Sequence, residues 1–242
     1  MNQPEPLTSE EERLRDEAVK FARENKKRIA KCLTDKKKYP KESDPVSVFM
    51  AGAPGAGKTE SSIELLKEFG GGVIRIDPDE LRDELPGYTG GNSWLFQFAV
   101  SILVDKAHDL ALEQKQSFLL DGTLAKYDLA ERNVARSIKR GRLVQILYVY
   151  QEPHLAWGFV QAREKDEGRR IPLVGFIDQY FESRRVVNSI KTRFGGDVKV
   201  DLLVKNRDNS VRSYKANVDQ IDSHLPERYD RESLLRELNP ER

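Results

Sequence analysis

Short apolar runs alternate with longer amphipathic stretches along most of this chain. Runs that suit buried β-strands recur at residues 46–51, 73–76, 117–121, 143–150 and 198–204. Segments with a helical spacing of apolar residues lie between them, at about 59–68, 93–115, 128–140, 153–167 and 173–193. Strands and helices that alternate in this way are typical of a parallel sheet covered by helices. We therefore expect an α/β fold with a mostly parallel sheet of about five strands.

A charged helix is predicted ahead of the first strand, over residues 9–37. Ser9 and Glu12 have the spacing of a capping box at its start. Its apolar residues recur at helical spacing, so we expect one face to pack on the rest of the protein. The predicted organisation is an N-terminal helix and linker over 1–45, followed by one domain over 46–242. Residues after about 205 are polar and predict a surface hairpin or a helical tail.

Composition excludes several classes of protein. The 41 Lys and Arg residues balance 40 Asp and Glu residues, so no overall charge attracts nucleic acid or a membrane. Cys32 is the one cysteine and there are three histidines, which argues against a disulfide within the chain and against a Cys- or His-rich metal centre. The chain has neither an apolar run long enough to span a membrane nor a signal-peptide core. We expect a soluble cytoplasmic protein.

A complete phosphate-binding loop follows the first predicted strand. The segment matches G-x-x-x-x-G-K-[ST] and stands between a strand and a helix, as this motif requires. Its glycines let backbone N–H groups turn toward phosphate oxygens, Lys58 can bridge the outer two phosphates, and the Thr59 hydroxyl can hold Mg²⁺. The nucleotide-binding residues that we predict are Gly52, Ala53, Pro54, Gly55, Ala56, Gly57, Lys58 and Thr59.

Acidic residues follow the second and third predicted strands. Asp77 and Asp79 come after the second, and Asp121, in an Asp-Gly-Thr segment that ends at Thr123, comes after the third. Ligands of open α/β sheets bind beyond the carboxyl ends of the strands. One Asp at such a place often merely caps a helix. Two such sites after a phosphate loop favour a small-molecule kinase, which needs one acid for the attacking hydroxyl and another to organise Mg²⁺.

Basic residues gather in the segment from Arg163 to Pro172. Arg163 lies near the end of a predicted helix, and Arg169 and Arg170 follow Gly168, a helix stop. Phosphoryl transfer spreads negative charge over phosphate oxygens, so enzymes bring guanidinium groups over them, often from a segment that closes on binding. A mobile lid and a solvated charged loop both fit this pattern.

Together these motifs resemble the zeta toxin family of P-loop kinases. The resemblance spans about residues 46–200 and rests on four segments in order: G-x-P-G-x-G-K-T, I-D-x-D-x-L-R, a strand ending in D-G-T, and an arginine-bearing lid ending in G-R-x-I-P. It implies ATP-dependent phosphorylation of the 3′-hydroxyl of the amino sugar in UDP-N-acetylglucosamine. It also implies that Lys58 and Thr59 bind ATP and Mg²⁺, and that Asp79 is the base acting on the sugar hydroxyl.

The same resemblance assigns the remaining site residues. It makes Arg163 and Arg169 the lid arginines, and the spacing to Pro172 favours Arg169 over Arg170. Asp77 would support the loop, and Asp121 would act near the sugar and the metal, beside Thr123.

The chain departs from the family pattern at three places. Asp121 replaces a glutamate of well-known members, Ala125 leaves no arginine two residues after Thr123, and residues 89–98 align poorly with the sugar-contacting segment. The acceptor is therefore the least constrained part of the assignment.

Zeta toxins are restrained by an antitoxin whose helix blocks the nucleotide site. The resemblance thus implies an antitoxin partner, and it raises two interpretations of residues 9–37: a structural prop on the sheet or a built-in inhibitor. Two other functions share the phosphate loop. One is a kinase of another small hydroxyl compound, such as an antibiotic, a nucleotide or a dinucleotide. The other is a nucleotide-dependent switch ATPase.

Overall fold

Six strands form one sheet in the order β2-β3-β1-β4-β5-β6. The computed structural model describes residues 7–168, 170–206, 208, 211–225 and 229–239. All neighbouring strands are parallel except β5 and β6, which are antiparallel. The predicted mostly parallel sheet is confirmed, and the polar segment after residue 205 supplies the sixth strand. The strands are β1 (Val46–Ala51), β2 (Ile74–Ile76), β3 (Phe118–Leu120), β4 (Leu143–Tyr150), β5 (Val198–Lys205) and β6 (Val211–Lys215).

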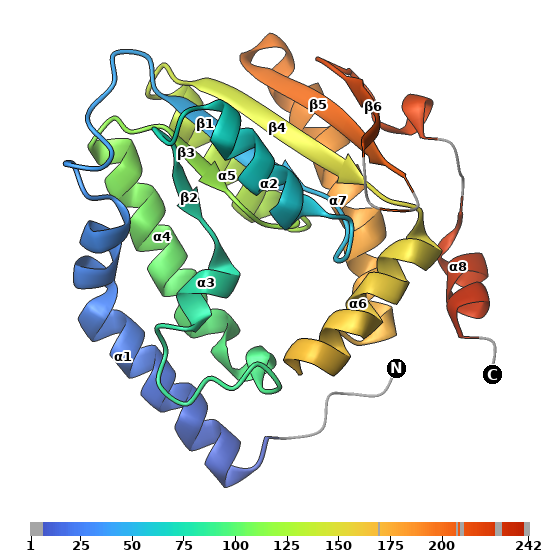
Figure 1. Cartoon of the computed structure of the whole chain (residues 1–242), viewed down its shortest axis with the longest axis horizontal. Helices are drawn as coiled ribbons and strands as arrows, with labels where there is room; N and C mark the ends of the chain where they lie inside the picture. The colour runs from blue at the N-terminus through green and yellow to red at the C-terminus, as the bar shows by residue number, and fades with distance from the viewer. Residues whose placement is uncertain (1–6, 169, 207, 209–210, 226–228, 240–242) are drawn as a thin grey trace.

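Helices cover both faces of this sheet (Figure 1). They are α1 (Ser9–Leu33), α2 (Lys58–Glu68), α3 (Pro78–Arg82), α4 (Gln97–Glu113), α5 (Tyr127–Ile138), α6 (Pro153–Glu167), α7 (Leu173–Phe194) and α8 (Arg231–Leu238), with 3₁₀ turns η1 (Ser93–Phe96), η2 (Gly195–Asp197) and η3 (Asp222–His224). None of the helices within the described ranges is long and apolar enough to cross a membrane.

Successive side chains of β1 lie in two different hydrophobic cores, one on each face of the sheet. Phe49 points to the larger core, where its ring meets that of Phe118 at 5.8 Å in an edge-to-face arrangement. Val48 and Met50 point to a smaller core beneath α2, with Leu147 of β4. Because successive side chains of a strand point to opposite faces, a central strand buried on both faces must be apolar at nearly every position.

Helix α1 packs along α4 and is part of the larger core (Figure 1). Ala18, Ala22 and Ile29 are buried there, and the side chain of Gln116 donates to the Thr34 carbonyl at 3.1 Å. The predicted apolar face is confirmed. The boundary between residues 45 and 46 stays a prediction about domain organisation.

The capping box of α1 lies one residue earlier than predicted. The hydroxyl of Thr8, not Ser9, accepts the N–H of Glu11 at 3.3 Å, and the Glu11 carboxylate accepts the Thr8 N–H at 2.8 Å. Thr8 is extended whereas Ser9 is already helical, and only an extended residue can turn its hydroxyl toward the first helical turn. The helix also ends earlier than predicted. Its last residue is Leu33, and the next residue, Thr34, is no longer helical.

Candidate active site

The phosphate loop joins β1 to α2 and is pressed against neighbouring backbone. Gly52 has a φ of +133°, and a Cβ there would lie 2.3 Å from the Val149 carbonyl oxygen. Gly55 has a φ of +73°, and a Cβ there would lie 2.1 Å from the Ala156 carbonyl oxygen. Glycine is therefore required twice over at both positions, by backbone conformation and by close approach. Contacts with β4 and α6 therefore constrain the shape of the loop, in addition to its own sequence.

Lys58 begins α2 and reaches back over the loop. Its ammonium group donates to the carbonyl oxygens of Gly52 at 3.0 Å and Ala53 at 2.7 Å. Gly57 caps α2 in the left-handed conformation and has no side chain to cap the helix N–H groups. An ammonium group, a helix N-terminus and loop amides make a donor set suited to a polyphosphate.

Asp121 follows β3 and is linked to α2 by Ser62. The Ser62 hydroxyl lies 2.9 Å from Asp121 Oδ2 and 2.8 Å from the carbonyl oxygen of Thr59. The backbone N–H of Gly52 also bonds the Thr123 carbonyl oxygen, at 3.3 Å. The structure thus brings Thr59, Asp121 and Thr123, which the sequence placed at two separate strand ends, to one edge of the sheet.

Asp77 and Asp79 lie at that same edge with different partners. Asp77 is the N-cap of α3, and its Oδ1 accepts the backbone N–H of Asp79 at 2.7 Å. Burial raises the pKa of Asp77 to about 6; the charge of Asp121 adds to this and that of Arg75 opposes it. The Asp79 side chain is 35% exposed and pairs with the buried Arg82 guanidinium. Asp79 is accordingly the more accessible acid, and Asp77 supports the helix that carries it.

The segment predicted to form a lid is described in part. Arg163 lies on α6 with an exposed side chain, and Arg170 Nε lies 3.8 Å from Glu164 Oε1. Arg169 lies outside the described residues. Gly168 ends α6 in the left-handed conformation, and a Cβ there would lie 3.4 Å from the Gly91 nitrogen. The end of α6 therefore meets the segment that joins α3 to η1 (Figure 1).

Sequence reasoning missed two residues that organise this site. Arg75 of β2 bonds Ser62, Asp77, Glu80 and Asp121. The signal was present, because Arg75 is the one charged residue within an otherwise apolar strand. Ser62 left no such signal, since a serine on a helix is ordinarily unremarkable.

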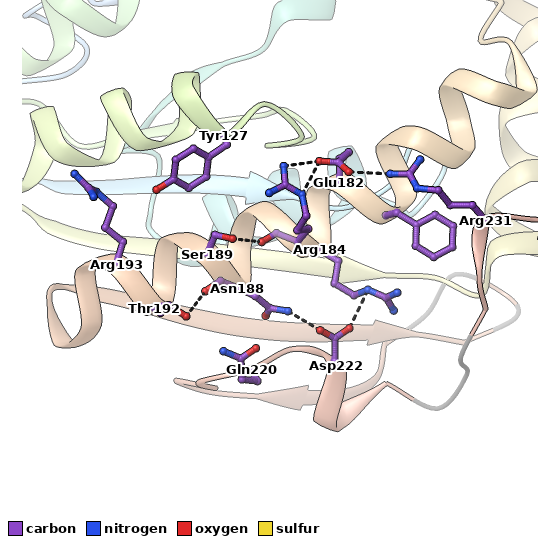
Figure 2. A pocket seen from close by; sticks show the side chains of 12 residues that line it. Tyr127, Glu182, Arg184, Asn188, Ser189, Thr192, Arg193, Gln220, Asp222 and Arg231 are labelled. Carbon is purple, nitrogen blue, oxygen red and sulfur yellow. Dashed lines mark hydrogen bonds and ion pairs between the residues drawn. The ribbon is translucent and has the colours of Figure 1, made fainter. Parts of the chain in front are cut away.

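A separate hollow lies on α7 and its surroundings (Figure 2). It encloses about 810 Å³, and none of its lining residues belongs to the phosphate loop or to the segments that carry the acids. Its arginines are paired: Arg184 with Asp222 at 3.0 Å, and Arg231 with Glu182 at 2.8 Å. Within the described part of the chain, no group of three or more His, Cys, Asp or Glu side chains could by itself hold a metal ion.

The fold and the site define the class of this protein. A phosphate loop between β1 and α2, on a mostly parallel sheet with β3 between β1 and β2, makes it a protein of the P-loop kinase fold. The family model described as Zeta toxin matches residues 29–219. The chain belongs to the zeta toxin family, as the motifs indicated.

Individual relatives agree with this assignment. The chain is 30% identical over 141 residues to toxin PezT of Streptococcus pneumoniae serotype 4, a match that covers 54% of this chain and 53% of that toxin. It therefore spans about half the length of this curated relative.

Solved structures share the fold at lower identity. A structure from the PezAT chromosomal toxin-antitoxin system of Streptococcus pneumoniae matches with a TM-score of 0.66 and 18% identity, over 94% of this chain and all of that one. The AvrRxo1-ORF1:-ORF2 complex with ATP matches with a TM-score of 0.58 and 16% identity, over 92% of this chain and 76% of that one.

Proposed function

We propose that this protein is an ATP-dependent kinase that phosphorylates a sugar hydroxyl of a nucleotide sugar, namely the 3′-hydroxyl of UDP-N-acetylglucosamine. The observation that carries the proposal is that a phosphate loop and Asp79 lie at the same edge of the sheet. Asp79 is a partly exposed acid, and the N-cap residue Asp77 accepts its backbone N–H. A switch ATPase needs a group that positions water but no acid dedicated to a substrate hydroxyl. Membership of the zeta toxin family supports this choice of acceptor.

The donor half of the site is built to hold ATP with Mg²⁺. Lys58 and the backbone N–H groups of residues 55 and 57–59 would bind the phosphates, since the N–H groups of Gly52 and Ala56 are bonded to carbonyl oxygens and Pro54 has none. The Thr59 hydroxyl and Asp121 Oδ1 accept or donate no hydrogen bond among the described residues, so both oxygens are open to a cation. Mg²⁺ in kinases commonly takes one or two protein oxygens and completes its shell with phosphate oxygens and water. When bound, it would neutralise charge on the phosphates.

Asp79 is the proposed base of the acceptor half. The acceptor hydroxyl oxygen forms a bond to the γ-phosphorus while the bond from that phosphorus to the β–γ bridging oxygen breaks. The hydroxyl proton passes to the Asp79 carboxylate, and ADP leaves. The neighbouring Arg82 guanidinium pairs with the Asp79 carboxylate before the acceptor binds. Arg163 and Arg169 would cover the phosphates from the lid.

A toxin role and an antitoxin partner are part of this proposal. They rest on the family and on the PezAT toxin-antitoxin match, and they fit a cytoplasmic protein. Of the two interpretations of the N-terminal helix, the prop is the better supported, because α1 packs on α4 and η1 and contributes to the core.

Transfer of label from γ-labelled ATP to UDP-N-acetylglucosamine tests the proposal. Lys58→Ala and Asp79→Asn should each abolish transfer while the thermal unfolding curve stays that of a folded protein. Asp83→Asn, a matched change of an exposed acid at the end of α3, should keep activity. Full activity in either of the first two variants would refute the assignment. Transfer to an antibiotic or nucleotide in an acceptor panel, with none to the nucleotide sugar, would identify the other kinase class.

A further inference from the structure

We infer that Arg75 is a positioning residue that joins the donor half of the site, where ATP would bind, to the acceptor half. The inference deepens the proposed function and rests on it. Arg75 stands in the middle of β2, between Ile74 and Ile76, which are fully buried on the opposite face. Its side chain is 11% exposed, so the charge lies inside the protein rather than on its surface.

The guanidinium of Arg75 reaches groups from three separate segments. Nε donates to the Ser62 hydroxyl at 3.1 Å, and Nη2 donates to Asp121 Oδ2 at 2.8 Å and also to Asp77. Nη1 pairs with Glu80. Helix α2, the end of β3 and the start of α3 are therefore held by one side chain.

These bonds determine which oxygen of Asp121 is available. Oδ2 is engaged by Arg75 and Ser62, which leaves Oδ1 without a hydrogen-bond partner in the described part of the chain. Ser62 is one helical turn after Thr59, the predicted metal ligand, and bonds its carbonyl oxygen. Arg75 thus sets the orientation of Asp121 relative to Thr59.

The same guanidinium orients the acceptor half. Asp77 Oδ2 pairs with Arg75, so Oδ1 is directed to the N–H of Asp79. Without a cation between them, the carboxylates of Asp77 and Asp121 would repel each other in a poorly solvated place. A lysine has one compact ammonium on a flexible stem and cannot reproduce the planar, multidentate bonding of a guanidinium.

The test measures ATP affinity by calorimetry, with Mg²⁺ and with a chelator, in the absence of any acceptor. In Arg75→Met, we expect affinity without Mg²⁺ to stay within about twofold, and the gain conferred by Mg²⁺ to fall about tenfold or more, as is usual when a residue supporting a metal ligand is lost. Arg184→Met is the matched control, since Arg184 is also a largely buried arginine paired with an acid, on α7 away from this site.

A second measurement separates positioning from a general structural role. If Arg75 acts through Asp121, then Arg75→Met should change the Mg²⁺-dependent gain much less in an Asp121→Asn background than in the wild type. If Arg75→Met does not fold, Arg75→Lys replaces it in the test because lysine keeps the positive charge. Arg75→Lys should fold and still lose most of the increase in ATP affinity that Mg²⁺ confers. An unchanged gain in a folded variant, an equal loss in Arg184→Met, or equal effects in both backgrounds would overturn the inference.

Failure of the proposed function is distinguishable from failure of this inference. A wild-type protein that binds ATP in a Mg²⁺-dependent way but transfers no phosphate to UDP-N-acetylglucosamine would refute that acceptor and leave the role of Arg75 standing. A wild-type affinity that does not depend on Mg²⁺ would overturn the inference itself.

Discussion

The side chain of Leu14 packs against the backbone of Gly87, so closely that a Cβ on Gly87 would lie 2.5 Å from Leu14 Cδ1. Leu14 belongs to α1, and Gly87 lies between α3 and η1, in the segment that continues to Gly91 beside the end of α6. The N-terminal helix therefore supports the segment that follows the proposed base, Asp79. This contact links α1 to the proposed acceptor half of the site.

Gly87→Ala tests the contact between the two residues. Gly87 has a φ of +81°, so alanine should cost about 1 kcal/mol in backbone strain and about 1 kcal/mol more for displacing Leu14 from its rotamer. Gly71→Ala is the control: its φ is +83° with no atom within 4 Å of the added Cβ, so it should show the first cost alone. Denaturant unfolding measures both. Equal losses of stability would mean that the contact with Leu14 contributes nothing.

Gly52→Ala should be much more damaging than an ordinary glycine substitution. The added Cβ would lie 2.3 Å from the carbonyl oxygen of Val149, a backbone atom of β4 that cannot move without disturbing the sheet. We expect a loss of about 3 kcal/mol or more in unfolding free energy. Gly72→Ala, where nothing lies within 4 Å and φ is ordinary, should change stability little. A thermal unfolding temperature for Gly52→Ala close to that of Gly72→Ala would show that the loop is less constrained than its geometry indicates.

Disruption of α1 should unfold the protein rather than activate it. Ala22 is fully buried, so Ala22→Asp places a charge in the core, whereas Arg23→Asp makes the matched change on the exposed side of the same helix. We expect Ala22→Asp to lose the cooperative unfolding transition and Arg23→Asp to keep it. Deletion of residues 1–40 should give an insoluble product. A soluble product of that deletion with higher ATP turnover would instead support the built-in inhibitor.

His108 should make the protein sensitive to acid. It is buried against Phe49 and Phe118, and neither ring nitrogen has a hydrogen-bond partner among the described residues. Burial, with smaller contributions from four nearby arginines, lowers the pKa of His108 to about 3. His108 therefore binds a proton more readily in the unfolded chain than in the folded protein. The contribution of neutral His108 to the free energy of unfolding is complete above pH 6.5 and is lost as the pH falls toward 3.

His108→Phe removes this titration while filling a similar volume. Between pH 7 and pH 5, the wild type should lose about 2 kcal/mol of unfolding free energy more than the variant, because one pKa unit is worth about 1.4 kcal/mol. Urea unfolding at the two pH values measures the difference. Parallel pH profiles of the two proteins would contradict a neutral, buried His108.

Much of the fold was predictable, and the phosphate-loop motif was recognisable, because their signals are local. Apolar runs of strand length specified β1 and β4 at the observed bounds, and the phosphate loop is a contiguous motif whose chemistry explains each position. Asp77, Asp79 and Asp121 were predicted as site residues because the end of a strand is visible in the sequence. The predicted capping box was wrong by one residue because Thr8 and Ser9 both carry a hydroxyl, and only backbone conformation distinguishes them.

The sequence by itself determined an α/β fold and a phosphate-loop motif at residues 52–59. Tertiary structure decided what surrounds that loop. The insertion of β3 between β1 and β2 brings Asp121 next to Asp77 and lets Arg75 join them, although 46 residues separate Arg75 from Asp121. Strand order and side-chain burial are properties of the folded chain as a whole, so no local pattern could reveal this ion-pair network or the contact of Leu14 in α1 with Gly87.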